Sequence, residues 1–194
     1  MSSKLAEPSK KVAIVLAATI AFSSSAFAST PAESDIIALE FPGAPLSVPG
    51  DATFVAQHPG LPADSIEILA ISGGVSSSGA TSIPNFQDVS LTKHFGASTP
   101  NLFLTIAEGK IPPTAHISFY RQLASGGPWM MYYQIRLATV LIDSFSFADV
   151  ETTSLTGAAE NLSLNYAKIE LQDIISGATV CFDRRLRVAG CSVP

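Results

Sequence analysis

The stretch from Phe86 to Lys110, FQDVSLTKHFGASTPNLFLTIAEGK, constrains the fold of this chain more than any other part of the sequence. Its first third has the alternation of a strand with one buried face, because Val89, Leu91 and, after one polar interruption, Phe95 fall on the same side. This part therefore predicts a strand that ends close to a glycine and two small polar residues.

Signals for a helix follow directly, over about Thr99 to Glu108. Ser98 or Thr99 can accept the unpaired N–H groups of a first turn, and Pro100 has no N–H group to leave unpaired. Gly109 can adopt the positive φ angle at which many helices end. The segment thus predicts one short helix of about three turns in a chain that otherwise reads as mainly β.

Most of the remaining sequence has the alternation of strands, interrupted by clusters of Gly, Pro, Ser and Asn. Strands are predicted at residues 35–41, 65–72, 88–95, 114–121, 130–142, 144–149 and 161–171. Short strands at this spacing are typical of a barrel or a sandwich. One face of each strand can fill the interior, and the other can meet solvent, a partner subunit or a lumen. The proline-rich stretch from Pro42 to Pro62 is expected to form a long loop.

The first residues have the features of a secretory signal peptide. Lys4, Lys10 and Lys11 precede an apolar run at residues 12–22, and Ala26-Phe27-Ala28 matches a cleavage site. A membrane anchor is the alternative, but spanning a bilayer takes about 20 apolar residues. We therefore expect a signal peptide at residues 1–28, followed by a polar leader at residues 29–33.

Charge and length limit the classes of function. Without the expected signal peptide the formal net charge changes from −5 to about −7, which argues against nucleic acid or an anionic membrane as a partner. The mature length of about 165 residues suits one domain with a core of its own. Charged residues make up only 14% of the chain and apolar residues 47%, a balance that hints at surface buried between subunits.

Both cysteines, Cys181 and Cys191, lie close together near the end of the sequence. In an exported protein such a pair predicts a disulfide, and the closed loop would stabilise the fold by about 3 kcal/mol in the loop-entropy description. Two independent thiols are the alternative, and two cysteines alone supply only half of a tetrahedral metal site. The arginine-rich loop between them could dock on a neighbouring subunit, although a small solvated hairpin is the simpler expectation.

Catalytic and metal-binding patterns are weak in this sequence. The segment GVSSSG at residues 74–79 differs from the nucleophile elbow of hydrolases at its second glycine, so Ser76 or Ser77 is a poor candidate nucleophile. His58, His94 and His116 lack the spacing of metal ligands. We accordingly expect no catalytic, metal or cofactor-binding residues and no cofactor, with a secreted serine hydrolase as a minor alternative.

Four blocks in the same order resemble the haemolysin-coregulated protein (Hcp) family, the tube proteins of bacterial type VI secretion. One is the strand and helix of residues 86–110, with its Thr-Lys and Ser-Thr-Pro-Asn-Leu motifs. The others are SIEILA with GVSSSG at residues 65–79, the strands AHISFYR and YYQIRL at residues 115–121 and 132–137, and ENLSLNYAKI at residues 160–169. Together the blocks cover most of the expected mature chain.

The resemblance implies a mainly β, Hcp-like antiparallel β-barrel with one short α-helix at about Thr99 to Glu108. The barrel would occupy residues 34–173, followed by a C-terminal extension at residues 174–194 that carries the disulfide. Family members are non-enzymatic subunits that form hexameric rings, which can stack into a tube and carry effectors. By analogy, Ile68, Leu69, Ser72 and Gly74 would lie near the ring seam or the lumen.

Two features depart from the family pattern and keep a second hypothesis open. Type VI tube subunits leave the cell through the secretion machine, whereas a signal peptide implies export by the general secretory route. The loop at residues 77–85, which helps one ring contact the next in the family, is also short. The alternative is therefore a secreted or periplasmic bacterial protein with an Hcp-like fold that acts as a binding or adhesion module. In the first hypothesis the partners are copies of the chain, and possible further partners are effectors or spike proteins.

Overall fold

The computed structural model describes residues 35–44, 48–77, 83–122, 127–151 and 156–194. The expected signal peptide and leader lie outside the described residues. The helices are α1 (Ala52–Gln57) and α2 (Thr99–Ala107). The strands are β1 (Asp35–Glu40), β2 (Ile66–Ile68), β3 (Ala70–Ser72), β4 (Val75–Ser76), β5 (Asn85–Phe86), β6 (Val89–His94), β7 (Thr114–Gln122), β8 (Trp129–Glu151), β9 (Thr156–Asp173), β10 (Thr179–Asp183) and β11 (Val188–Ala189).

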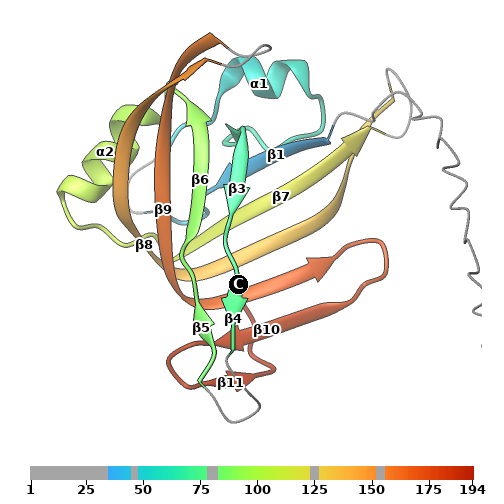
Figure 1. The fold of residues 1–194 in the computed structure, drawn as a ribbon. Helices are drawn as coiled ribbons and strands as arrows, with labels where there is room; N and C mark the ends of the chain where they lie inside the picture. Colours follow the sequence, from blue (N-terminus) through green and yellow to red (C-terminus); the bar gives the residue numbers. More distant parts are fainter. Residues whose placement is uncertain (1–34, 45–47, 78–82, 123–126, 152–155) are drawn as a thin grey trace, which may run out of the picture. The chain divides into compact units, whose positions relative to one another are not determined.

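The main sheet is antiparallel and strongly curved, and its strands run in the order β11-β10-β9-β8-β7-β1-β2. β8 and β9 are long enough to take part in two halves of the fold, because the first part of β9 also pairs with β6 and its last part with β10. Figure 1 shows both strands bending across the whole molecule. The strands predicted at residues 130–142 and 144–149 are one strand, β8, with an irregular register between Ile142 and Ser144.

A short segment joins the two edges of this curved sheet. β2 pairs with β1, β3 pairs with β6, and Leu69 between them donates its N–H group to the carbonyl oxygen of Thr92 at 2.8 Å. The sheet therefore curves round one interior. Its two edges are joined by two short strands in succession, β2 on one edge and β3 on the other, and not by one strand that pairs with both. The mainly β architecture expected from the sequence is confirmed.

The core lies inside this curved sheet and is filled by the inward faces of the strands and by α2. Its fully buried members include Leu39, Ile117, Leu137, Val140, Leu162 and Leu164. The outer face is also covered in places, because Tyr120 and Ala38 pack against Phe54 of α1. Alternation predicted the two faces of β7 and β8, and the tertiary structure shows that parts of both are buried.

The predicted helix is present as α2, and its end is as expected, with Gly109 at a φ of +63°. Its start differs from the prediction. Ser98 is the cap residue, but its own backbone is helical and its side chain caps nothing. Thr99 instead accepts the N–H group of Gly96 at 3.0 Å, so the hydroxyl secures the turn before the helix rather than the helix itself.

A second helix, α1, lies within the stretch that was expected to be a long loop, so that prediction was wrong. Asp51 caps it by accepting the N–H groups of Thr53 and Phe54 at 3.0 and 3.1 Å. The residue before the cap, Gly50, must be a glycine, because a Cβ atom there would lie only 2.4 Å from the carbonyl oxygen of Ala63. An aspartate followed by a short run with the apolar pair Phe54 and Val55 was the signal, and the surrounding prolines masked it.

Residues that the sequence placed in an extension beyond the barrel continue the sheet. β10 pairs with β9 over Thr179–Asp183, and β11 turns back on β10. The arginine-rich loop between the two cysteines was expected to be solvated. One of its arginines, Arg184, instead donates a hydrogen bond to the carbonyl oxygen of Tyr166 at 2.9 Å. Neither helix of the described part of the chain has the length and hydrophobicity needed to cross a bilayer.

Candidate functional site

The four candidate seam or lumen residues lie in one segment but differ in exposure. Ile68 is buried and packs in the main core of the subunit. Leu69 is half-buried, whereas Ser72 and Gly74 are exposed. All four stay residues that are predicted to lie near a seam or a lumen.

The segment after β3 forms a small sheet of its own. β4 pairs with β5 through Val75 with Phe86 and Ser76 with Asn85, and Gln87 donates its N–H group to the carbonyl oxygen of Gly74 at 2.8 Å. The loop between them includes residues 78–82, which lie outside the described residues. Ser76 therefore lies in a two-stranded sheet, not at the strand-to-helix turn of a nucleophile elbow.

The three histidines lie in separate places in the fold. The Nδ1 atom of His58 lies 2.8 Å from the carbonyl oxygen of Phe54, and its ring meets Trp129 edge-on. His94 ends β6, and His116 lies in β7. Within the described ranges, no three His, Cys, Asp or Glu side chains are arranged to hold a metal ion.

A buried ion pair joins β6 to β9 and was not predicted. The Lys93 Nζ atom lies 2.6 Å from Glu160 Oε1, and the two side chains are only 2% and 0% exposed. Lys93 also donates to the carbonyl oxygen of His94 at 2.7 Å and to Thr99 Oγ1 at 3.3 Å. The pair thus fixes the start of α2 against the sheet. The alternation of Val89 and Leu91 puts residue 93 on the buried face, but the partner that balances its charge, Glu160, lies 67 residues away in the sequence and is brought to it only by the pairing of β6 with β9.

A row of phenylalanine side chains forms an exposed apolar surface over α2 and the second half of β8. We call Phe95, Phe103, Phe145 and Phe147 the phenylalanine surface. Their rings follow one another at centroid distances of 5.2 to 6.1 Å. Phe95, Phe103 and Phe147 are exposed, Phe147 to 67%, whereas Phe145 is half-buried against the core. Exposed apolar surfaces of this kind often mark sites of protein association.

Further exposed apolar side chains lie singly around β10 and β11. Ile175 and Leu186 lie in the turns at the two ends of β10, and Val180 and Val188 face opposite sides of the β10–β11 hairpin. Sequence reasoning missed the phenylalanine surface, since an apolar residue in a strand is first expected in the core. Phe147 in β8 is its most exposed member.

The residues after β11 are fixed on the outer face of the sheet. A disulfide joins Cys181 to Cys191 with their Cα atoms 5.1 Å apart, and both lie near Ala138 and Val193. The N–H group of Val193 donates to Glu170 Oε2 at 3.0 Å, and Arg136 pairs with the same carboxylate and donates to the carbonyl oxygen of Val193 at 3.2 Å. We call residues 191–194 the tail. Its contacts cover part of the outer face of β7, β8 and β9.

His116 contributes to this contact and makes it dependent on pH. Its Nε2 atom lies 3.2 Å from the carbonyl oxygen of Pro194, and burial lowers the pKa of the ring below its ordinary value of 6.5. The nearby Arg136 also lowers this pKa, while the Pro194 contact and Glu170 oppose the shift. Folding therefore favours the neutral ring.

We expect the stability contributed by His116 to be complete above pH 6.5 and to fall as the pH drops toward the pKa of the folded state. Over that range the unfolded chain binds a proton that the folded chain does not, and one proton changes stability by at most about 1.4 kcal/mol per pH unit. Urea unfolding at pH 7.5 and 5.5 should show a larger loss for the wild type than for His116→Gln. A His94→Gln control should behave like the wild type. Equal losses for wild type and His116→Gln would contradict the assignment.

Comparison with known proteins gives one consistent result. Residues 48–172 match the family described as "Type VI secretion system effector, Hcp". Protein hcp1 of Pseudomonas aeruginosa is 34% identical over 91 residues, which are 45% of this chain and 51% of that protein. The chain thus spans about half the length of the curated relative that it matches.

Solved structures with the same fold share little sequence with this chain. Hcp1 from Salmonella typhimurium superposes with a TM-score of 0.64 at 16% identity, over 81% of this chain and 99% of that one. The secreted protein Hcp3 from Pseudomonas aeruginosa gives 0.60 at 19% identity, over 78% and 98%. At this identity the likeness supports the fold alone.

Proposed function

This chain belongs to the Hcp family of type VI secretion proteins, and we propose that it is a non-enzymatic subunit that forms hexameric rings with copies of itself. The match over residues 48–172 carries this proposal, because it includes every strand from β2 to β8, α2 and nearly all of β9. The rings would stack and carry effectors, with effectors or spike proteins as further partners.

The phenylalanine surface supports assembly with other copies of the chain. It lies around α2 and the second half of β8, and its exposed rings can be buried against a neighbouring subunit. A closed ring forms when such a surface meets a different surface of the next subunit and the repeated rotation returns to the first subunit. Ile68, Leu69, Ser72 and Gly74 are proposed to lie near the ring seam or the lumen.

Native mass spectrometry of the chain from Ser29 onward tests the proposal. We expect hexamers at micromolar concentration and rings one subunit thick by negative-stain microscopy. The variant Phe147→Asp should reduce the hexamer fraction at least tenfold without changing the melting temperature, because a charge on the phenylalanine surface must lose its water in the interface. Only monomers in the wild-type protein would contradict ring formation.

A second candidate function is a secreted or periplasmic binding or adhesion module with the same fold. The Cys181–Cys191 disulfide favours it, since disulfides persist mainly in oxidising compartments. Expression in a bacterial strain without a type VI machine distinguishes this function from that of a type VI secretion subunit. Appearance of the protein outside the cytoplasm with Ser29 as its first residue would support export by the secretory route, and retention of the whole chain in the cytoplasm would argue against it.

A further inference from the structure

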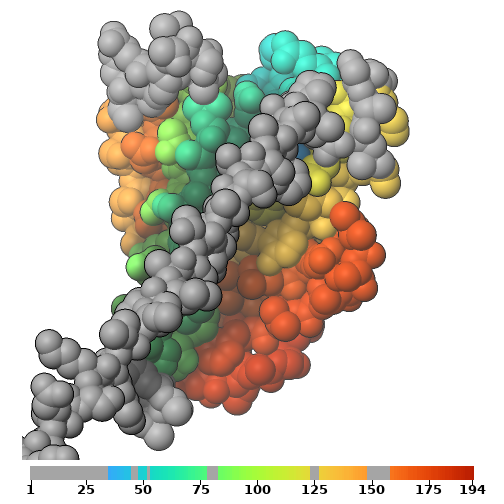
Figure 2. All heavy atoms as spheres, turned by 45° about the vertical axis from the view of Figure 1, so that its right-hand side comes forward, coloured from blue at the N-terminus to red at the C-terminus, as the bar shows by residue number. Residues whose placement is uncertain are grey.

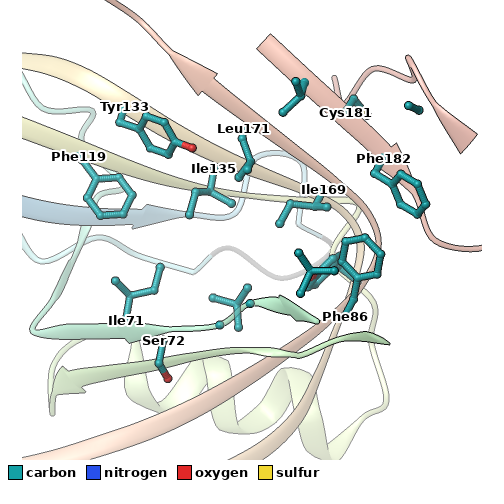
Figure 3. Close-up of a pocket in the computed structure, with 17 residues that line it drawn as sticks. Ile71, Ser72, Phe86, Phe119, Tyr133, Ile135, Ile169, Leu171, Cys181 and Phe182 are labelled. Atoms are coloured by element: carbon teal, nitrogen blue, oxygen red, sulfur yellow. The ribbon is translucent and has the colours of Figure 1, made fainter. Parts of the chain in front are cut away.

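The curved sheet leaves an apolar pocket of about 540 Å³ at one end of its interior. Figure 3 shows Phe119, Tyr133, Ile135, Ile169 and Leu171 on one side of it and Ile71 and Ser72 on the other. Apart from Ser72, which follows Ile71 in β3 and is exposed, these side chains come from the inward faces of β3, β7, β8 and β9, so the pocket continues the core rather than lying on the outer surface.

The β10–β11 hairpin supplies one wall of this pocket. Val180 is the cross-strand neighbour of Leu171, and the ring of Phe182 stacks on Phe86 at 5.0 Å between centroids. Cys181 and Ala189 also line the pocket. The family match ends at residue 172, so this wall is built by a part of the chain outside it. Figure 2 shows the C-terminal strands, in red, beside the yellow residues of β7 and β8.

The chemistry of the lining limits what can enter. Among the described residues that line the pocket, none carries a charged side chain, and the hydroxyl groups come from Ser72, Tyr133 and Tyr166. The Tyr166 hydroxyl already donates to the carbonyl oxygen of Gln87 at 3.1 Å. A charged group would lose its water here without a replacement. A peptide segment would likewise leave most of its backbone N–H and C=O groups without partners.

We propose that this pocket binds a single unbranched alkyl chain, such as that of a medium-chain fatty acid in solution. An alkyl chain has no polar groups along its length, and the pocket volume lies within the range of small-molecule sites, which often occur in the mouths of β-barrels. The head group remains at the opening, where Val75 and Val180 are 59% and 64% exposed. The site lies within one subunit and does not depend on ring formation.

Binding of the uncharged dye N-phenylnaphthylamine to the full mature chain tests this site. We expect saturable fluorescence that decanoic acid and decanol both reverse, because the alkyl chain and not the head group is recognised. Val180→Asp should weaken dye binding about tenfold, since the occupant would cover an ionised carboxylate. Ile175→Asp is the matched control, being exposed, close in sequence and outside the lining, and it should bind as the wild type does.

Three results would overturn the proposal. One is unsaturable dye binding, and another is an equal effect of Val180→Asp and Ile175→Asp, which would mean adsorption to any apolar surface. The third is binding to phosphatidylcholine vesicles while free decanoic acid fails to displace the dye, which would assign the surface to a bilayer. Hexamer formation is measured separately, so a protein that binds decanoic acid but stays monomeric would contradict only the ring proposal.

Discussion

Replacing Lys93 with methionine is expected to lower the free energy of unfolding by about 3–5 kcal/mol, because Glu160 would remain buried without its counter-charge. In the folded chain the Lys93 ammonium group lies 2.6 Å from Glu160 Oε1, and both side chains are almost fully shielded from water. The second carboxylate oxygen, Glu160 Oε2, already has no hydrogen-bond partner among the described residues. Removing Lys93 therefore leaves the whole carboxylate unpaired.

The double variant Lys93→Met/Glu160→Leu should recover most of this loss, to within about 1 kcal/mol of the wild type. Apolar side chains of similar volume often replace a buried ion pair at little cost, since both desolvation penalties disappear together. Urea unfolding at fixed protein concentration measures all three proteins. A double variant as unstable as the single one would show that the hydrogen bonds to His94 and Thr99, and not the unpaired charge, account for the effect.

An exposed ion pair in the same fold supplies the matched control. Arg121 pairs with Asp35 at 2.9 Å, and these side chains are 40% and 39% exposed. Asp35→Asn should cost less than about 1 kcal/mol, because solvent screens the pair and hydrates either partner alone. Both ion pairs connect neighbouring strands and differ mainly in burial. The difference between their losses of unfolding free energy therefore measures the effect of burial.

Opening the Cys181–Cys191 disulfide should lower the free energy of unfolding by about 3 kcal/mol. The cross-link restricts the unfolded chain, and the loop-entropy description gives this magnitude for a sequence separation of 10. The tail should lose its order first, because only a few contacts with Arg136, Glu170 and His116 would then hold it. We expect faster hydrogen exchange at Val193 than in β8.

Thermal unfolding with and without dithiothreitol measures this effect. The variant Cys181→Ser/Cys191→Ser controls for the reductant, since its melting temperature should be low in both conditions and unchanged between them. An equal shift in the variant would mean that dithiothreitol acts elsewhere. An unchanged melting temperature in the reduced wild type would show that the tail contacts hold the fold without the cross-link.

Local signals along the chain were enough to predict α2 and the longer strands up to β9, but not β4, β5, β10 or β11. Alternation in β7, and the Pro100 and Gly109 signals around α2, depend only on neighbouring residues and on the backbone angles that each residue permits. The likeness of four ordered blocks to one family then indicated the Hcp-like fold. The helix α1 was missed because its single cap, Asp51, lies among prolines and glycines that usually mark a loop.

What the tertiary structure alone decided is which of the two faces of each strand is buried, and against what. Lys93 interrupts an otherwise apolar alternation on the buried face of β6, and only the fold shows that its charge is matched by Glu160 of β9. The same holds for β10, which adds to the sheet and forms a wall of the pocket. Alternation follows from the two-residue repeat of a strand, but burial depends on distant segments such as α2 and the tail, whose positions no local pattern encodes.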